Sequence, residues 1–423
     1  MMPAAKELID LLLLNKLPVF WFFIAYVWIL FIYKLLLARK YTPYTAAYTA
    51  SASVIIPVYN EPPRILKKVL NSLKTNLTDL KEIIIALDYR DKHAMEVLKQ
   101  YKSELQEKLR ILVIKEKGKR IAVATGLKKA KGDIAVIMDS DTILCDSNTI
   151  STLIKPFADP TVGGATTNQR INMNPHNDLK KRFSDWMESM RCHLSFPAMS
   201  VKGVVGCLPG RCIAIRRKLL LPHLDTEFLN EKFRGVKCET GDDRCLTHIV
   251  LRQGYKTVFQ STARVLTEAP STWRAFLKQQ LRWIRSSRRE TLANLNWMVK
   301  KPFILSFIFI SDILIPLFFS LIFLNALIWF TLPFDVASIF TAAFLQTITG
   351  ALVITPLGII ISIGLRQIPH LKQNLKDLKI LPLYVLYCTF ILTPLCIYGL
   401  ITAKEQAWMT RRRSNTQSLS VQQ

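Results

Sequence analysis

The sequence predicts an α/β domain, built on a doubly wound parallel sheet, that is inserted between transmembrane helices. Three observations predict this class. Long apolar stretches lie near both ends, short apolar runs alternate with charged helical patterns between them, and 50% of the 423 residues are hydrophobic while 21% are charged. This balance excludes a disordered chain and a small disulfide scaffold. The net charge of +26 indicates an anionic partner, and the apolar segments favour a membrane surface or a phosphate-bearing substrate over a nucleic acid.

Residues 1–41 contain the first predicted transmembrane helix. The stretch 17–33 has no charged residue and is bracketed by Lys16 and Lys34. Because no small-residue cleavage site follows the apolar run, we expect this helix to be retained rather than removed as a signal peptide. Basic residues crowd its C-terminal side, which places the following domain in the cytoplasm.

Residues 42–270 have the pattern of a globular α/β domain. Four apolar runs have the length and composition of buried strands: 53–58, 82–88, 110–115 and 133–139. Helical patterns accompany these strands at 61–75, 92–108 and 119–131. Strands that alternate with helices form parallel sheets with helices on both faces, so we expect such a sheet here.

Residues 271–301 predict an amphipathic helix. Apolar side chains including Trp273 and Phe276 recur on one face of its first part. Basic side chains recur on another face: Arg274, Lys278, Arg282, Arg285 and Arg289. Such a helix is typical of the membrane interface, where its basic face lies beside anionic lipid headgroups.

Residues 302–403 predict further membrane segments. Only Asp312 and Asp335 are charged in the stretch 303–365, which leaves enough apolar chain for two crossings. We therefore expect two spans here.

The polar stretch 366–379 and the tail 404–423 are both basic, so we expect both to be cytoplasmic. One simple crossing would put them on opposite sides of the membrane. For the apolar stretch 380–402 between them we therefore favour a re-entrant or interfacial segment, and a third full span is the alternative.

The eight cysteines show no C-x-x-C pair and no zinc-ligand spacing, so we interpret them as reduced thiols that face the cytosol. Cys207 and Cys212 flank a Pro-Gly turn. A buried, inert thiol is favoured there over a thiol beside a substrate channel.

Polar residues follow the first two predicted strands. Tyr59 and Glu61 come directly after the first strand, and Asp88 ends the second. Ligands of open parallel sheets bind beyond the carboxyl ends of the strands, so these residues line one crevice. Asp88 can accept hydrogen bonds from a base or ribose there, and Tyr59 offers a stacking face. The alternative for Asp88 is a turn residue or a helix cap.

A sharper pattern lies in residues 118–142. A basic helix that begins with Lys119 and Arg120 precedes a strand that delivers Asp139 and Asp141, two residues apart and therefore on the same side. Paired carboxylates at a strand end suit Mg²⁺ or Mn²⁺, and the two basic side chains suit a diphosphate. The alternative is a solvated basic helix followed by a capped turn.

Two further constellations carry chemistry. Adjacent Asp242 and Asp243 stand just before a predicted helix, where capping explains one carboxylate but not easily both, and a carboxylate held there can act as general base toward a hydroxyl. Gln279, Arg282 and Trp283 fall at i, i+3 and i+4 and project together. The arginine can hold a leaving diphosphate and the indole a sugar ring. The alternative for the indole is an anchor at the bilayer surface.

Six motifs, in the order VIIPVYNE, ALDYRD, GKR, DSD, GDDR and QQLRW, resemble the signature of membrane-embedded family 2 glycosyltransferases. The resemblance covers about residues 51–290. It is above all to bacterial hyaluronan synthases and the related chitin-oligosaccharide and cellulose synthases, and it continues more loosely into a C-terminal segment similar to W-G-T-R. It implies a GT-A fold, a UDP-sugar donor, Mg²⁺ or Mn²⁺, and an inverting transfer to a saccharide acceptor that builds a β-linked chain.

The resemblance also implies roles for individual residues. Donor contacts fall to Tyr59, Glu61, Asp88, Lys119, Arg120 and Asp139. The metal ligands are Asp141 and Asp139. The general base is Asp243, with Asp242 beside it. The residues at the diphosphate and the acceptor are Gln279, Arg282 and Trp283.

The chain departs from the family pattern in three places. Hyaluronan synthases usually read S-G-P-L where this chain has residues 207–210, near the acceptor terminus, so the identity of the acceptor stays open. Met409 replaces the glycine of W-G-T-R, and the N-terminus supplies one span rather than two.

The functional prediction is a processive polysaccharide synthase of the plasma membrane, with a cytoplasmic catalytic domain and export of the product. The alternative is a non-processive transferase that adds a single sugar to a lipid or short saccharide acceptor. A non-catalytic membrane or nucleic-acid binder is disfavoured by the intact Asp139, Asp141 and Asp243, so no nucleic-acid partner is expected. The sequence leaves the sugar, the product length and the oligomeric state open.

Overall fold

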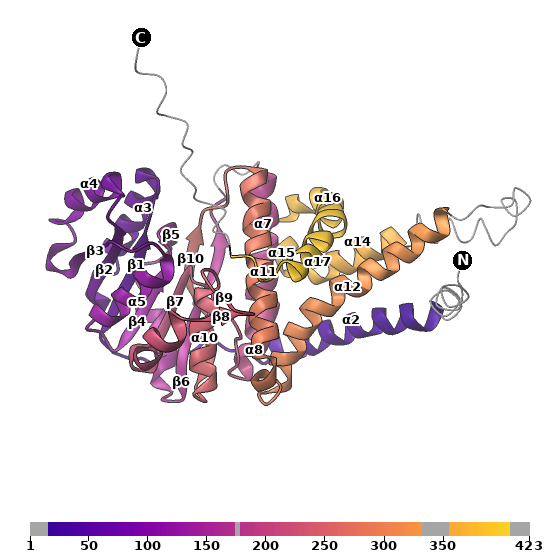
Figure 1. Cartoon of the computed structure of the whole chain (residues 1–423), viewed down its shortest axis with the longest axis horizontal. Helices are drawn as coiled ribbons and strands as arrows, with labels where there is room; N and C mark the ends of the chain where they lie inside the picture. Colours follow the sequence, from indigo (N-terminus) through magenta and orange to yellow (C-terminus); the bar gives the residue numbers. More distant parts are fainter. Residues whose placement is uncertain (1–15, 174–177, 332–354, 407–423) are drawn as a thin grey trace, which may run out of the picture.

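The structure is a computed structural model that describes residues 16–173, 178–331 and 355–406. It has two parts, an α/β body and a group of apolar helices that extends from one side of it (Figure 1). The predicted tail beyond residue 406, with Met409, and the chain around Asp335 lie outside the described residues.

The body is built on one sheet of eight strands. Its order is β3 (Leu109–Ile114), β2 (Leu80–Asp88), β1 (Ala52–Val58), β4 (Ile134–Met138), β7 (Cys212–Arg216), β6 (Val162–Ile171), β10 (Lys256–Thr267) and β5 (Thr142–Leu144). The four strands predicted from apolar runs are β1 to β4, and they pair in parallel as expected. A separate small hairpin contains β8 (Lys232–Phe233) and β9 (Val236–Lys237).

The sheet is not parallel throughout, which corrects the predicted parallel sheet. β7 runs antiparallel to β4 and β6, and β5 runs antiparallel to β10. The chain before β7 gives the reason for its direction. Val204 pairs in parallel with Thr257 at the start of β10, and Arg211 O accepts a hydrogen bond from Asp139 N beyond the end of β4. The segment 204–211 thus rises to the carboxyl edge of the sheet, and β7 must run back from it.

Alternate residues of the strands feed two hydrophobic layers, so helices cover both faces of the sheet. Ile55 of β1 belongs to the layer of α5 (Lys119–Lys129), whereas Val54 and Ile56 belong to the opposite layer. The helices of that opposite layer are α3 (Pro63–Lys74), α4 (Lys92–Tyr101) and α6 (Thr149–Ile154). The helices predicted between the strands are therefore present, although α4 ends earlier than expected.

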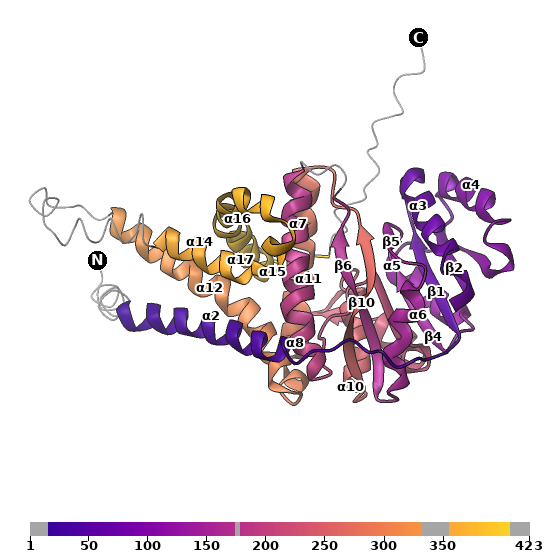
Figure 2. The same cartoon turned by 180° about the vertical axis from the view of Figure 1, so that it is seen from behind.

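Two long helices separate the sheet from the apolar helices. α7 (Leu179–Met190) continues through a π-helical turn into α8 (Phe196–Val201), and it stands beside α11 (Trp273–Met298) in both views (Figures 1 and 2). α10 (Asp242–Arg252) precedes β10. The chain that leads from the first apolar helix to β1 crosses the back of the sheet (Figure 2), where Tyr41 Oη donates to Phe259 O at 2.9 Å.

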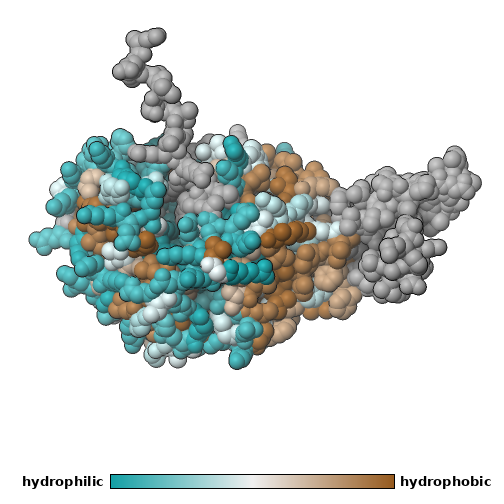
Figure 3. Space-filling view, in the orientation of Figure 1, coloured by the Kyte–Doolittle hydropathy of each residue, from teal (hydrophilic) through white to brown (hydrophobic). Residues whose placement is uncertain are grey.

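The apolar helices are α2 (Lys16–Ala38), α12 (Phe303–Thr331), α14 (Thr355–Arg366), α16 (Leu381–Tyr387) and α17 (Thr393–Ile401). The short polar helix α15 (Ile368–Gln373) lies between α14 and α16. By length and composition, two described helical stretches can cross a membrane, Phe303–Leu321 and Leu375–Ile401, and Phe22–Ala38 is shorter. Figure 3 shows apolar side chains gathered over these helices and hydrophilic ones over the body. The predicted re-entrant segment 380–402 coincides with the second stretch up to Ile401, and its placement in a membrane stays a prediction.

The polar segment between α14 and α16 packs against the body. Trp186 Nε1 on α7 donates to Asp377 Oδ2 at 3.1 Å, and His370 Nε2 lies 2.8 Å from the same oxygen. All three side chains are buried. The segment thus packs against the body, and its placement on the cytoplasmic side of a membrane stays a prediction.

Candidate active site

A cavity of about 1540 Å³ opens at the carboxyl edge of the sheet and continues to the apolar helices. It is lined by every side chain that sequence reasoning assigned to the site: Tyr59, Glu61, Asp88, Lys119, Arg120, Asp139, Asp141, Asp242, Asp243, Gln279, Arg282 and Trp283. Phe309 of α12, Ile363 of α14 and Tyr384 of α16 line it as well. The fold thus brings the predicted residues to one place, while the role of each stays a prediction.

The loops after β1 and β2 form one end of the cavity, which we call the donor end. Asp88 Oδ1 accepts from Arg90 N at 3.0 Å and from Arg90 Nε at 2.7 Å, so the pKa of Asp88 is lowered. The Arg90 guanidinium lies 5.0 Å from the centre of the Tyr59 ring. Sequence reasoning missed Arg90, although it stands inside the A-L-D-Y-R-D motif. Asp91, and not Asp88, caps α4 by accepting from Ala94 N at 3.0 Å.

Glu61 connects the end of β1 to the D-S-D loop after β4. Ser140 Oγ donates to Glu61 Oε2 at 2.5 Å, and both side chains are buried. Asp139 and Asp141 flank this serine and line the cavity. Among the described residues, no three His, Cys, Asp or Glu side chains gather as a metal site. Two carboxylates nevertheless fit a divalent ion that takes its remaining ligands from waters and phosphate oxygens.

The Lys119 ammonium connects the D-S-D loop to the start of α10. Its Nζ lies 2.8 Å from Asp139 Oδ1 and 2.9 Å from Asp242 Oδ2. Burial lowers the pKa of Lys119, but the carboxylates of Asp139, Asp242 and Asp243 outweigh burial and raise it overall. A firmly charged ammonium at this point suits an anionic group such as a diphosphate.

Asp242 and Asp243 begin α10 directly after Gly241, the N-cap residue, whose φ of +85° favours glycine. Gly210 N donates to Asp243 Oδ2 at 3.1 Å. Burial and the neighbouring Asp242 raise the pKa of Asp243, whereas Lys119 overcomes burial and lowers the pKa of Asp242. The pair thus contains one firmly ionised carboxylate and one with raised proton affinity, and the second suits a general base.

Cys207 lies beside this carboxylate pair and lines the cavity. Its Sγ is 3.9 Å from Asp243 Oδ2. Burial and the Asp243 charge raise the pKa of the Cys207 thiol to about 12, so the thiol stays protonated and inert. The two sequence interpretations therefore both apply, since the thiol is inert and yet adjoins the cavity. All eight cysteines are free, as expected.

The other end of the cavity, which we call the acceptor end, is centred on Trp283. Two guanidinium groups face its ring, Arg211 at 5.3 Å and Arg191 at 5.6 Å from the ring centre. Glu188, which is 1% exposed, lies 2.8 Å from Arg211 Nη1 and 3.2 Å from Arg191 Nη1. Trp283 therefore lines the cavity and does not serve as a bilayer anchor. Sequence reasoning missed these three partners because only tertiary packing brings them to the tryptophan.

The predicted lipid-facing character of α11 needs correction. Arg285 and Arg289 are 4% and 1% exposed; Arg285 Nε donates to Thr402 Oγ1 at 2.9 Å and Arg289 Nη2 donates to Thr240 O at 2.6 Å. Phe276, on the apolar face, is fully buried in a cluster with side chains of α7 and α16. Protein groups thus occupy parts of both faces where the sequence pattern predicted lipid, whereas Trp273 and Arg274 at the start of the helix are exposed.

Arg120 also departs from its predicted role. Its guanidinium, which is 5% exposed, donates from Nη1 to Phe228 O at 2.8 Å and from Nη2 to Thr240 O at 3.1 Å. Nη2 also donates to Glu231 Oε2 at 2.5 Å. Arg120 touches the cavity, but these contacts to protein groups hold its guanidinium, so we favour Lys119 as the residue that meets a diphosphate.

Comparison with known proteins places these features in a family. The family model described as "Glycosyltransferase like family 2" matches residues 50–286, and the model described as "Chitin synthase" matches residues 226–418. A hyaluronan synthase of Streptococcus pyogenes is 28% identical over 90% of this chain and 88% of its own length. An N-acetylglucosaminyltransferase of Mesorhizobium japonicum is 28% identical over 85% of this chain and 82% of its own length.

A solved structure resembles the chain over most of its length. It is the mannosyltransferase PcManGT from Pyrobaculum calidifontis in complex with GDP-Man and Mn²⁺, with a TM-score of 0.59, 20% sequence identity, and coverage of 84% of this chain and 98% of that one. At this identity the likeness concerns the fold. It confirms the predicted α/β fold of GT-A type.

Proposed function

The chain belongs to the family 2 glycosyltransferases, and we propose that it builds a β-linked polysaccharide by repeated, inverting transfer from a UDP-sugar to a growing saccharide chain. One observation carries the proposal: the cavity that contains the catalytic carboxylates continues to α12, α14 and α16. Its volume of about 1540 Å³ exceeds the roughly 300–1,000 Å³ of ordinary small-molecule sites. A cavity of this size has room for a donor and for part of a polymer.

The carboxylate pair would carry out the proton transfer. Asp243 takes the proton of the acceptor hydroxyl as that oxygen bonds to C1 of the donor sugar, and the bond from C1 to the diphosphate breaks on the opposite face, which inverts the configuration. The raised pKa of Asp243 makes it the stronger base of the pair. Asp242 stays ionised beside Lys119.

The two ends of the cavity would hold the two substrates. At the donor end, Tyr59 and Asp88 take the uridine and Lys119 takes the diphosphate. At the acceptor end, the Trp283 ring stacks on a sugar, and Arg282 stabilises the charge that develops on the departing UDP. Mg²⁺ or Mn²⁺, held by Asp141 and Asp139, would neutralise charge on the diphosphate.

We place the apolar helices in the plasma membrane and the body in the cytoplasm. Large apolar side chains are exposed along these helices, with Phe22 at 72%, Leu321 at 59% and Ile401 at 75%. Surfaces of this kind require apolar surroundings, which a bilayer supplies. The growing polymer would leave the cavity on the side of these helices.

The test is UDP release from detergent-solubilised protein supplied with single UDP-sugars and their pairs, with Mg²⁺ or Mn²⁺, followed by sizing of the product. A long product supports the proposal; one donor then indicates a homopolymer, and a requirement for two donors an alternating polymer. A single added sugar on a lipid or short saccharide contradicts processivity. Transfer from GDP-mannose alone contradicts the proposed donor.

A further inference from the structure

We infer that Arg120 and Arg289 are positioning residues that hold the Thr240 carbonyl from two sides and thereby fix the start of α10 with its catalytic carboxylates. The inference rests on the proposed function and deepens it. It gives one shared role to two residues whose predicted roles, at the donor and at the lipid surface, the structure does not support.

The Thr240 carbonyl receives hydrogen bonds from two guanidinium groups. Arg289 Nη2 of α11 donates to this oxygen at 2.6 Å, and Arg120 Nη2 of α5 donates to it at 3.1 Å. Arg289 Nη2 also donates to Thr240 Oγ1 at 3.1 Å. Thr240 itself is 3% exposed. Two cations on one buried carbonyl are a far stronger restraint than an ordinary backbone contact.

The next residue leaves α10 no room to move toward α11. A Cβ on Gly241 would lie 2.9 Å from Ser286 Oγ and 3.3 Å from Arg289 Nη2, so the backbone there touches α11 directly. The φ of +85° adds a conformation that side chains rarely adopt. The position of Asp242 and Asp243 therefore follows the position of α11.

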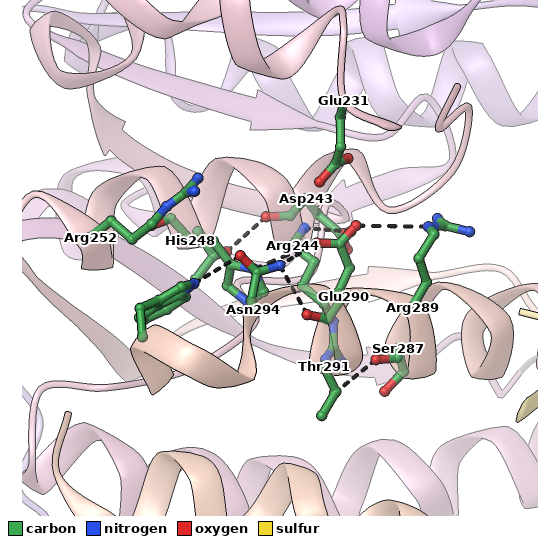
Figure 4. Close-up of polar contacts among 12 residues, drawn as sticks. Glu231, Asp243, Arg244, His248, Arg252, Ser287, Arg289, Glu290, Thr291 and Asn294 are labelled. Atoms are coloured by element: carbon green, nitrogen blue, oxygen red, sulfur yellow. Dashed lines mark hydrogen bonds and ion pairs between the residues drawn. The ribbon is translucent and has the colours of Figure 1, made fainter. Parts of the chain in front are cut away.

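A half-buried carboxylate, Glu231, and a buried one, Glu290, lie beside the two guanidinium groups. Glu231 Oε2 accepts from Arg120, and Glu290, next to Arg289 on α11, is 1% exposed. Figure 4 shows the Arg289 guanidinium facing the Glu290 carboxylate, with Asn294 beyond it; Asn294 Nδ2 donates to Glu290 Oε2 at 3.3 Å. Buried charges of this kind are weak evidence for stability, so a role in geometry is the better explanation.

The contacts of Arg120 and Arg289 with the Thr240 carbonyl link the donor end, the acceptor end and the carboxylate pair of the site. Arg120 follows Lys119, whose ammonium contacts Asp139 and Asp242, and Arg289 lies on the helix that carries Trp283. The Thr240 carbonyl is thus the point where α5 at the donor end and α11 at the acceptor end both contact the start of α10. Loss of either guanidinium should displace the base without removing a donor contact.

The experiment compares Arg120→Lys and Arg289→Lys with the wild-type full chain in detergent. A lysine keeps the charge but cannot reproduce the spread of contacts that each guanidinium makes. We expect kcat for transfer to fall by about 10- to 100-fold, because small displacements of a catalytic group have effects of this size. The donor KM, the Kd for UDP and the binding of one UDP per chain should stay unchanged in calorimetry. The double variant should fall by less than the product of the single effects, because both residues act on one carbonyl.

Arg216→Lys is the matched control, since its guanidinium also donates to backbone carbonyls, those of Val162, Phe157 and Asp159, but lies outside the cavity lining. Its kcat should equal that of the wild type. Weaker UDP binding by Arg120→Lys at unchanged kcat would overturn the inference and restore the diphosphate role. Fewer UDP-binding chains with unchanged kcat per site would also overturn it, because that result indicates a purely structural role. A wild-type protein that releases no UDP with any donor would overturn the proposed function first, and with it the premise of this inference.

Discussion

The donor end and the acceptor end of the cavity are built in different ways. At the donor end, Asp88 and Asp139 stand at the carboxyl ends of β2 and β4, on either side of β1, and Lys119 stands at the start of α5, each within a short sequence motif. At the acceptor end, Trp283 meets Arg191 and Arg211, which come from the end of α7 and from the segment before β7. Local sequence therefore determines the donor chemistry, while long-range packing determines the acceptor chemistry. The predictions below test whether the two ends can be perturbed separately.

Asp243 is the proposed general base, so its loss should have the largest effect. Asp243→Asn keeps the shape of the side chain and an oxygen for the hydrogen bond from Gly210, but it removes the base. We expect kcat to fall by about 1,000-fold, within the range of general base catalysis, with unchanged UDP affinity in calorimetry. Near-normal turnover would show that another group takes the proton.

Lys119→Met should damage mainly the donor end, although it also removes the cation beside Asp242. It removes the cation that lies between Asp139 and Asp242 and that we assign to the diphosphate. We expect the donor KM to rise by about 100-fold, as for the loss of one or two charge-assisted hydrogen bonds to the diphosphate. Initial-rate kinetics at varied UDP-sugar concentration measure it. Lys128→Met, on the same helix but in an exposed ion pair with Asp225, is the control and should behave as wild type. An unchanged KM would refute the diphosphate role.

Trp283→Ala should damage the acceptor end alone. Loss of an aromatic stacking face should lower the elongation rate by about tenfold, while hydrolysis of the donor in the absence of acceptor continues. Product sizing and UDP release measure the two quantities separately. Trp273→Ala is the control, because this tryptophan lies on the same helix but outside the cavity lining, and its product length should stay unchanged. A parallel loss of both activities would show that the two ends are not separable.

The pH profile should show the smallest change, a shift rather than a loss. Transfer requires ionised Asp243, so kcat falls as the pH drops through the pKa of this residue. Burial and Asp242 raise that pKa, which places the acidic limb above the usual range for a carboxyl. Asp242→Asn removes the neighbouring charge and should move the limb to lower pH. The profile of kcat against pH measures it, and an unmoved limb would argue against coupling within the pair.

The sequence identified the residues that gather at the donor end because its motifs lie at the ends of strands and at the start of a helix, and the role of each residue stays a prediction. Arg120 shows where this logic fails. Arg120 touches the cavity, but its guanidinium is held by Phe228 O, Glu231 and Thr240 O, which lie more than 100 residues away in the sequence. Periodicity also identified the basic face of α11, but it could not show that the acceptors for Arg285 are Thr402 and Glu405 rather than lipid. The direction of β7 could not be predicted either, because it depends on the pairing of Val204 with Thr257, which are distant in the sequence.

The contacts of Arg285 on α11 with Thr402 and Glu405 near the C-terminus limit how the catalytic domain can be produced by itself. A chain truncated after Met298 would contain every assigned site residue, yet Arg285 would lose Thr402 and Glu405. The apolar face of α11 around Phe276 would also lose its packing against α16 and meet water. Such a fragment should be recovered as an aggregate, and a soluble preparation should instead retain the chain to at least Glu405 in detergent or lipid nanodiscs.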